Sequence, residues 1–423
     1  MIKILKSSEY IPAAAQGTSS AGVSDSVRAI IADVIARGDA AVLEYTQLHD
    51  ACSPESFKVP ASALDAALAH VGAEFAGVLQ RAADNIEAFH RRQIREGFVF
   101  TPADGVVLGQ RILPLRRVGI YIPGGTAPYP STVLMNAIPA KIAGVGEIIM
   151  VTPPSKDGVN PAILAAAKIA GVDRVFTVGG AQAIAALAYG TKTIPRVDKI
   201  TGPGNEYVAE AKRQVFGIVG IDMIAGPSDI LIVADEKGDD VLIAADMLSQ
   251  CEHGGDGAAA VLVTTCAELA RKVAAEIERQ LAELPRETIA RQAVENHSQI
   301  IIAESLDEAF DISNNLAPEH LEIFLDEPFE YLGRVTNAGS VFLGRNTPEP
   351  LGDYYAGPNH TLPTSGTARF SSGLGVEDFT KRSTFTYYSE DALRKVGDDV
   401  VAFAEKEGFT AHARAVTKRM EQQ

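Results

Sequence analysis

The middle of the chain repeats one pattern of hydrophobic and polar positions. Residues 140–151 read AKIAGVGEIIMV and residues 167–178 read AKIAGVDRVFTV, so each copy has apolar residues at helical spacing and then a β-branched run. Gly144 and Gly171 lie between the two parts, where glycine ends a helix in the left-handed conformation. The pattern predicts a helix followed by a buried strand, used twice. Such units form right-handed crossovers in a parallel sheet, and we expect ligands at the carboxyl ends of its strands.

A second run of alternating elements begins after Asp229. Apolar and β-branched runs separated by helical periodicity predict a further set of strands and helices. The expected strands are 230–234, 258–264 and 300–302, and the expected helices are 239–251 and 269–284. This alternation predicts a second α/β domain.

The two flanking regions predict helices. Residues 24–115 carry helical periodicity that Gly38 interrupts. The apolar residues of the first such helix share one face: Val27, Ile30, Ile31, Val34 and Ile35. From about residue 368 the chain is polar and helical, and its last segment, 405–423, is too polar to form a core alone. We expect this tail to lie across another domain or another subunit.

These patterns together predict an α/β fold with two incomplete Rossmann-like parallel-sheet domains plus a small helical C-terminal tail region. Residues 1–120 are expected to form a helix-rich N-terminal arm and the first part of α/β domain 1. Residues 121–229 would form α/β domain 2, residues 230–367 the remainder of domain 1, and residues 368–423 the helical tail.

Composition narrows the classes of function. The 423 residues carry a formal net charge of −16, which disfavours nucleic acid because binding to phosphates needs clustered Lys and Arg. The three cysteines have no CxxC spacing, so a reducing compartment fits better than a disulfide framework. No apolar run approaches the ~18 residues typical of a membrane span. We therefore expect a cytoplasmic protein without membrane or nucleic-acid partners.

Four possible metal ligands lie far apart in the chain. Gln250 and His253, at i and i+3 near the end of a predicted helix, can face one metal ion. Asp353 lies in a loop rich in Gly and Pro, and His412 lies in the terminal helix. Each has an ordinary alternative: a solvent-facing or capping side chain, a turn residue, or an exposed histidine. If they do bind a metal, the fold must bring them together.

Glu319 and His320 place a carboxylate beside an imidazole, the two commonest proton-transfer groups in enzymes. A helix-capping Glu is the structural alternative. Three glycine-rich loops, 121–126, 179–182 and 202–205, could bring backbone amides against phosphates, although tight packing also requires glycine. The dinucleotide fingerprint GxGxxG does not occur. The residues alone therefore predict a metal-assisted α/β enzyme.

Several long motifs resemble those of the histidinol dehydrogenase family, in the same order and across residues 25–416. They are GIYIPGGTAPYPSTVLMNAIPAKIAG, VGGAQAIAALAYGT, DKITGPGNEYVAEAKRQVFG, IDMIAGPSDILIVAD, APEHLEI, AGSVFLG and GDYYAGPNHTLPTSGTARFSSGL. The resemblance implies an NAD-dependent oxidation of L-histidinol to L-histidine, the last step of histidine biosynthesis. It proceeds through L-histidinaldehyde and consumes two NAD.

The resemblance also implies a metal centre and a homodimer. The motifs SQCEHG, LGDYYAGPNH and EGFTAHARAV place Gln250, His253, Asp353 and His412 as ligands of one Zn²⁺ per subunit. In this family the last ligand comes from the partner subunit, so the active sites are shared. The metal positions the substrate's imidazole and amino nitrogens more than it activates water.

The remaining site residues follow from the same motifs. Glu319 and His320 match the family's acid/base pair, and Tyr121, Gln182 and Asn205 match contacts to NAD, which places NAD binding in residues 121–229. Residues matching substrate contacts are Ser228, His320, His360 and Glu407, together with the four ligands Gln250, His253, Asp353 and His412. Asp229 stands where the family usually has Glu.

Three other readings stay open. A relative of the same fold could oxidise another alcohol, notably sulfopropanediol, with the same groups, although the intact YIPGGTAPYPSTV motif favours histidinol. A zinc hydrolase would use the metal, Glu and His but would turn over without NAD. A non-catalytic scaffold would have little reason to retain Glu319, His320 and all four ligands.

Overall fold

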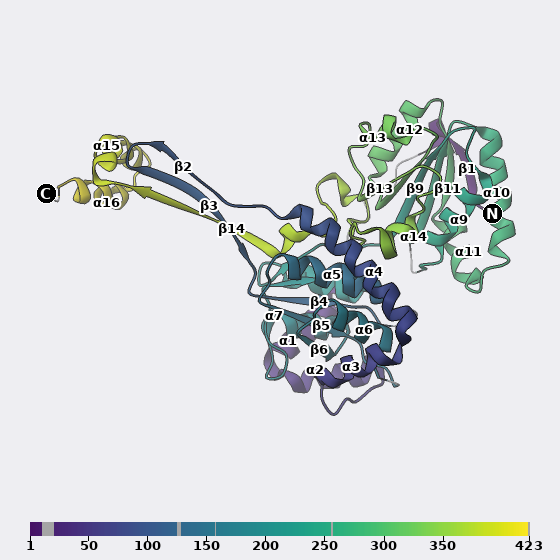
Figure 1. The fold of residues 1–423 in the computed structure, drawn as a ribbon, viewed down its shortest axis with the longest axis horizontal. Coiled ribbons are helices and arrows are strands. Elements are labelled where there is room, and N and C mark those ends of the chain that lie inside the picture. Colours follow the sequence, from purple (N-terminus) through teal and green to yellow (C-terminus); the bar gives the residue numbers. More distant parts are fainter. Residues whose placement is uncertain (11–20, 125–127, 157, 255–256, 422–423) are drawn as a thin grey trace. The chain divides into compact units, whose positions relative to one another are not determined.

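The structure, a computed structural model, forms two compact units (Figure 1). Unit 1 comprises Met1–Gln93 and Leu115–Phe379, and unit 2 comprises Ile94–Pro114 and Thr380–Gln423. The described residues are 1–10, 21–124, 128–156, 158–254 and 257–421. They form three β-sheets, two parallel ones in unit 1 and an antiparallel one in unit 2.

The first sheet of unit 1 has five parallel strands in the order β6-β5-β4-β7-β8. The strands are β4 (Arg117–Tyr121), β5 (Glu147–Thr152), β6 (Arg174–Thr177), β7 (Lys199–Thr201) and β8 (Gly220–Ile221). Along β5 the side chains alternate between two cores, with Ile148 and Met150 in one and Ile149 and Val151 in the other. Because both faces are buried, the strand reads as a continuous hydrophobic run.

Helices cover both faces of the five-stranded sheet. One core includes α3 (Ala61–His70), α4 (Gly72–His90), α5 (Pro130–Ile142) and α6 (Pro161–Ile169). The other includes α1 (Ala21–Arg37), α2 (Asp39–Asp50), α7 (Gly180–Tyr189) and α8 (Glu206–Val215). The predicted repeat is confirmed: α5 ends before Gly144 (φ +83°) and α6 before Gly171 (φ +71°), and each is followed by a strand.

The second sheet of unit 1 has six parallel strands in the order β1-β11-β10-β9-β12-β13. Its strands are β1 (Lys3–Lys6), β9 (Asp229–Ala234), β10 (Ala259–Thr264), β11 (Gln299–Ile302), β12 (His320–Phe324) and β13 (Ser340–Leu343). One face packs against α9 (Asp240–Cys251), α10 (Ala267–Leu281) and α11 (Glu287–Asn296). The other packs against α12 (Leu306–Leu316) and α13 (Pro328–Leu332). Both parallel sheets confirm the predicted α/β class.

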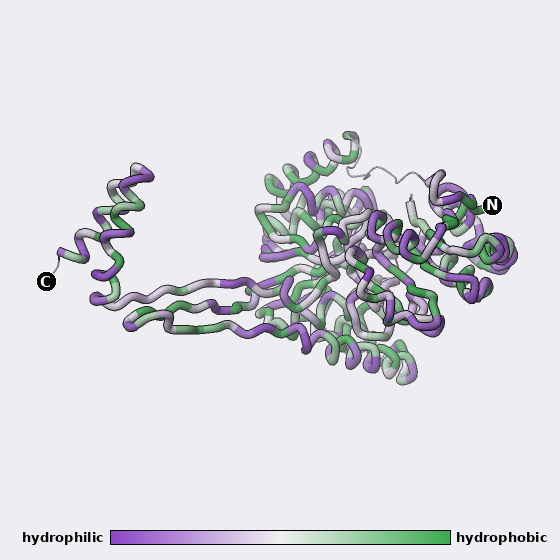
Figure 2. Tube along the Cα trace, turned by 90° about the horizontal axis from the view of Figure 1, so that it is seen from above, coloured by the Kyte–Doolittle hydropathy of each residue, from purple (hydrophilic) through white to green (hydrophobic). Residues whose placement is uncertain are grey.

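Unit 2 has a different architecture. Its antiparallel sheet, in the order β14-β3-β2, consists of β2 (Phe98–Ala103), β3 (Val106–Pro114) and β14 (Thr380–Tyr388), and two helices follow, α15 (Glu390–Lys406) and α16 (Thr410–Glu421). Its buried residues are few and mostly small: Val106, Gly109, Ala392, Gly397, Ala404 and Ala413. Large apolar side chains remain exposed, among them Phe403 at 73%. Hydrophobic and hydrophilic residues are interspersed along the strands and helices of unit 2 (Figure 2).

The predictions for the flanking regions were wrong in part. Residues 98–103, 106–114 and 380–388 were expected to be helical but are strands of unit 2. β2 and β14 are exposed at nearly every position, so their sequences lack the alternation of buried and exposed residues that indicates a strand. Residues 1–120, expected to form a helix-rich arm and the first part of α/β domain 1, contribute strands to all three sheets. Val27, Ile30, Ile31 and Val34 are buried on the predicted face of α1, but Ile35 is exposed.

The remaining elements are short turns of helix. They are α14 (Glu349–Leu351), a π-helical turn at Gly352–Ala356, and 3-10 turns at Ser7–Glu9, Arg91–Gln93, Thr367–Arg369 and Val376–Phe379. Among the described residues no single helix is long and apolar enough to cross a membrane; one pair, Ala61–His70 with Gly72–Gln93, meets the length and composition criteria only when taken together, and it is bent by 109°.

Candidate functional site

The candidate acid/base pair, Glu319 and His320, lies at the amino end of β12, beside the amino end of its neighbour β9. β9 begins at Asp229 and β12 begins at His320, and the two strands pair in parallel. Ala317, in the left-handed conformation (φ +52°), ends α12 and turns the chain into β12. The expectation of ligands at strand carboxyl ends concerned the sheet built from the 140–178 repeat, whereas these candidate residues lie at the amino ends of strands in the six-stranded sheet. The pair is also not a helix cap, because no helix starts here.

Asp229 contacts both members of the pair. Its backbone N–H donates to Glu319 Oε2 at 3.1 Å, and its Oδ1 accepts from the Glu319 N–H at 2.9 Å. Its carbonyl oxygen lies 3.1 Å from His320 Nδ1 and can only accept, so this ring nitrogen carries a proton. The other ring nitrogen, Nε2, is therefore the one that gains or loses a proton while this contact is kept.

His320 Nε2 faces two further carboxylates. It lies 3.5 Å from Asp353 Oδ1 and 3.9 Å from Glu349 Oε1. Ligand atoms of His320, Glu349 and Asp353 all lie within 4.8 Å of one another, a grouping that could hold a metal ion. Asp353 was predicted as a ligand. Glu349 was missed, although a carboxylate four residues before Asp353, near a helical turn, gives a signal at the right spacing.

Glu349 also connects the elements that carry the candidate ligands. Its N–H donates to Glu322 Oε1 on β12 at 2.8 Å, and its Oε2 accepts from Ser249 Oγ on α9 at 3.2 Å. Gln250 follows Ser249 directly. These contacts hold the Asp353 segment against β12 and the end of α9.

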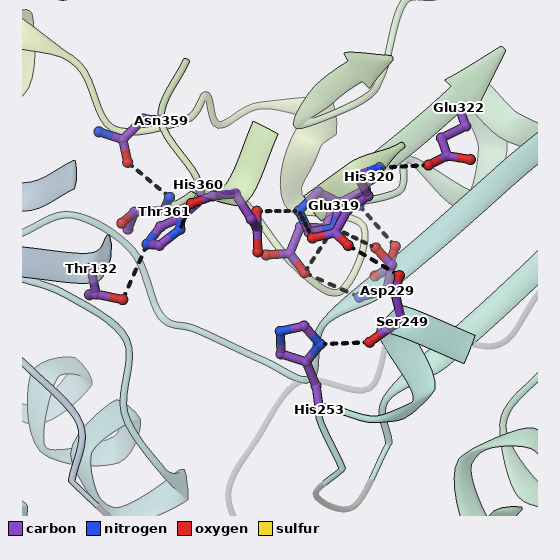
Figure 3. A network of polar contacts seen from close by, with 12 residues as sticks. Thr132, Asp229, Ser249, His253, Glu319, His320, Glu322, Asn359, His360 and Thr361 are labelled. Atoms are coloured by element: carbon purple, nitrogen blue, oxygen red, sulfur yellow. Dashed lines mark hydrogen bonds and ion pairs between the residues drawn. The ribbon is translucent and has the colours of Figure 1, made fainter. Parts of the chain in front are cut away.

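The end of α9 supplies Gln250 and His253. Gln250 is fully buried, and neither atom of its amide has a hydrogen-bond partner among the described residues. Leaving a buried amide unpaired is unfavourable, so its environment fits a ligand to an ion. His253 Nδ1 lies 3.2 Å from the carbonyl oxygen of Ser249, which leaves Nε2 available. Figure 3 shows His253, His360 and the Glu319–His320 pair around one region. These residue types fit Zn²⁺.

The pKa values of several ionisable side chains in this region are strongly shifted. Burial raises the pKa of Glu319 to about 8. Burial alone would lower the pKa of His320, but the Glu319, Asp353 and Glu349 carboxylates outweigh it and raise that pKa to about 10. Burial, reinforced by Asp353, raises the pKa of Glu349 to about 8. Carboxyl groups that resist ionisation are typical of sites for proton transfer or cation binding.

His360 connects the site to α5, a helix that packs on the five-stranded sheet. Its Nδ1 lies 2.9 Å from the carbonyl oxygen of Asp353, and its Nε2 lies 3.2 Å from Thr132 Oγ1 on α5. His360 and Asp353 both line a cavity of about 110 Å³. Ser228 directly precedes Asp229, so it too lies at the amino end of β9. The structure thus brings His360, Ser228 and the acid/base pair to one region.

The residues predicted to contact NAD lie at the carboxyl ends of strands in the five-stranded sheet. Tyr121 ends β4, Gln182 lies in the first turn of α7 just after β6, and Asn205 follows β7 and caps α8 by accepting from Val208 N–H at 3.1 Å. Tyr121 Oη accepts from the Gly180 N–H at 3.1 Å. The Gly125–Thr126 part of the first glycine loop lies outside the described residues.

Two features of these loops fit a dinucleotide. Gln182 is 1% exposed, and neither amide atom has a partner among the described residues. The strand order reverses beside β4, since β5 and β6 lie on one side of it and β7 and β8 on the other. Such a switch point is where open α/β sheets bind ligands.

Glu407 and His412 belong to unit 2. Glu407 follows α15, and His412 lies in α16 with its ring stacked on Phe409 at 5.1 Å between centroids. Both side chains are exposed within the chain. Their predicted parts in substrate and metal binding stay predictions.

Comparison with known proteins identifies the family. The family model for histidinol dehydrogenase matches residues 14–420. The chain is 53% identical to a histidinol dehydrogenase of Listeria innocua, over 96% of this chain and 95% of the relative, and 54% identical to that of Clostridium acetobutylicum, over 96% and 94%. The crystal structure of histidinol dehydrogenase from Elizabethkingia anophelis superposes with a TM-score of 0.92 at 38% identity, covering 99% of this chain and 98% of that one. The chain therefore belongs to the histidinol dehydrogenase family and is an oxidoreductase.

Proposed function

We propose that the protein oxidises L-histidinol to L-histidine through L-histidinaldehyde, with zinc as metal and NAD as electron acceptor. One observation supports the proposal: the catalytic candidate His320 lies 3.5 Å from Asp353, so a predicted proton-transfer group and one predicted metal ligand are neighbours. Overall, one histidinol, two NAD and one water give one histidine, two NADH and the released protons.

The first oxidation requires a base for the alcohol proton. His320 Nε2 is suited to accept it because Asp229 fixes the ring by binding Nδ1–H. The surrounding carboxylates favour the protonated ring, and Asp353 would favour it less once engaged as a ligand. NAD, when bound, accepts the hydride that leaves the carbinol carbon. The proton held by His320 must then pass to solvent before the ring acts again.

The second oxidation requires a water molecule to add to the aldehyde. Glu319, once ionised, can take a proton from that water, and Asp229 N–H holds the Oε2 of this carboxylate in place. The hydrate then loses its alcohol proton and a second hydride. Glu319 and His320 thus divide hydration and deprotonation between two neighbouring side chains.

Gln250, His253 and Asp353, with His412 of the partner subunit, would hold the zinc. An amide, two imidazoles and one carboxylate leave a net positive centre with room for substrate nitrogens. The metal would bind and orient the substrate's imidazole and amino groups beside His320. Ser228, His360 and Glu407 are proposed to contact the same substrate.

The homodimer is part of this proposal. Unit 2 buries few residues of its own and exposes Phe98, Phe100, Tyr387 and Phe403, which is typical of a surface that another subunit covers. If His412 acts across subunits, inactive His412→Ala chains mixed with inactive His320→Ala chains should regain part of the activity. No recovery after mixing would count against a shared site. The cytoplasmic location stays a prediction.

The decisive experiment follows NADH formation by zinc-loaded protein with L-histidinol and NAD, beside a chelator-treated sample and a sample with sulfopropanediol. Two NADH per histidinol, lost on chelation and restored by zinc, would support the proposal. Activity only on sulfopropanediol would keep the mechanism and change the substrate. Turnover that needs no NAD would favour a zinc hydrolase, and no NADH from either alcohol would refute the dehydrogenase proposal.

A further inference from the structure

A fully buried ion pair lies behind the loop that follows β7. The side chains of Lys212, on α8, and Asp222, after β8, are 1% and 0% exposed and form an ion pair. Removing two charges from water costs free energy that their attraction recovers only when both are well bonded, and apolar residues of similar size are often as stable. Stability of the fold alone therefore does not explain why two charged residues occupy this buried position.

Both charged groups bind the same residue, Gly202. The Gly202 N–H donates to Asp222 Oδ2 at 2.7 Å, and Lys212 Nζ donates to the Gly202 carbonyl oxygen at 2.9 Å. Asp222 Oδ1 accepts in addition from the Met223 N–H at 2.6 Å. The pair thus fixes the orientation of both peptide groups that flank Gly202.

Gly202 in turn lies against the end of β4. Its φ of +109° favours glycine, and a Cβ at this position would lie 2.1 Å from the carbonyl oxygen of Tyr121. The Tyr121 hydroxyl accepts from Gly180 at the start of α7, the helix that carries Gln182. Asn205 lies three residues beyond Gly202. The ion pair therefore contacts the loop of Asn205 directly and the loops of Tyr121 and Gln182 through Gly202. These loops lie where the strand order of the sheet reverses.

We propose that Lys212 and Asp222 are positioning residues for the dinucleotide. They hold the 202–205 loop in its binding conformation before the dinucleotide arrives, so that less ordering is required on binding. This inference rests on the proposed NAD-linked function. The two side chains act through Gly202 and do not need to touch the dinucleotide or the substrate.

The test uses paired substitutions, because a single one would leave an unpaired buried charge and could unfold the protein. Lys212→Met with Asp222→Leu removes both bonds to Gly202 and both charges. Lys212→Met with Asp222→Asn removes the charges but keeps an oxygen to accept from the Gly202 N–H. Arg213→Gln is the matched control. Arg213 pairs with Glu210 on the same helix, and Glu210 Oε1 still accepts from Gln214 Nε2 at 2.7 Å when the guanidinium is removed. Arg213 makes no hydrogen bond to residues 202–205, all of which the structure describes.

We expect the Met/Leu variant to bind NAD about tenfold more weakly by calorimetry and to raise KM for NAD similarly. The Met/Asn variant should lose less affinity, and Arg213→Gln none. At saturating NAD, kcat should stay within about twofold of wild type, because lost uniform binding changes KM alone. Zinc content and KM for L-histidinol should not change, whereas a general structural defect would alter them together.

Unchanged NAD affinity in a folded Met/Leu variant, or equal losses in the Arg213→Gln control, would overturn the inference while leaving the proposed function intact. If wild type binds NAD but does not reduce it with L-histidinol, the proposed function fails, and the calorimetric difference still tests the ion pair. If wild type does not bind NAD at all, both fail.

Discussion

The two parallel sheets of unit 1 place their candidate chemistry at opposite ends. In the five-stranded sheet, Tyr121 and the loops before α7 and α8 follow strand carboxyl ends, where helix N-termini favour anions such as phosphates. In the six-stranded sheet, Asp229 and His320 begin their strands, and Gln250 lies in the last turn of α9, where the helix dipole favours a cation. Under the proposed function, the two sheets hold oppositely charged ligands at different strand ends.

The largest effect is expected from the acid/base pair. Glu319→Gln should lower kcat by roughly 100- to 10,000-fold, the range for loss of a proton-transfer group, while NAD affinity stays unchanged. Steady-state kinetics and calorimetry with NAD measure the two effects separately. An equal loss of NAD affinity would show that the two strand ends do not act separately.

Gln182 and Gln250 are buried, and their amide atoms have no hydrogen-bond partner within the described part of the chain. One lies on a helix beside each parallel sheet, so the two allow a matched test. Gln250→Leu should weaken zinc binding by about 10- to 100-fold or more, since even loss of an outer contact costs that much. It should also stabilise the metal-free protein by about 1–3 kcal/mol, because an unpaired amide is replaced by an apolar side chain. Metal titration and thermal unfolding with chelator measure both.

Gln182→Leu is the matched substitution at the other sheet. It should raise KM for NAD about tenfold, as expected for a lost hydrogen-bonding partner, and leave zinc affinity unchanged. If Gln182→Leu reduced zinc affinity, or Gln250→Leu affected NAD alone, the assignment of the two ends would be reversed.

Much of the α/β architecture could be predicted, because buried parallel strands and amphipathic helices have clear periods. The strands of unit 2 could not, since β2 and β14 are exposed on both faces and lack a buried period. Within the site, Glu319 and His320 were recognisable as adjacent proton-transfer groups. Glu349 and the contacts of Asp229 depend on which strands are neighbours, and the sequence alone does not specify that β9 pairs with β12.

Substitution of Asp229 should lower kcat less than substitution of the acid/base groups that it positions. Asp229→Ala removes the acceptor for the Glu319 N–H, and we expect kcat to fall about tenfold through misplacement of the pair. Asp229→Asn keeps an oxygen at that position and should retain most of the activity. Equal losses in both variants would indicate that the negative charge, and not the hydrogen bond, is what the pair requires.

The smallest effect is expected from a change of pH. It should alter kcat, which depends on Glu319, but not NAD affinity, which depends on the other sheet. Burial raises the pKa of Glu319 to about 8, so this carboxyl is mostly neutral at pH 7 and gains its active, ionised form as pH rises. If water activation limits turnover, kcat should increase about fivefold from pH 7 to pH 8. Burial raises the pKa of Tyr121, at the other end, to about 12, so NAD affinity should stay constant over that range. Oxidation of supplied L-histidinaldehyde isolates the Glu319 step, and a rate that falls as pH rises would mean that Glu319 acts in its protonated form.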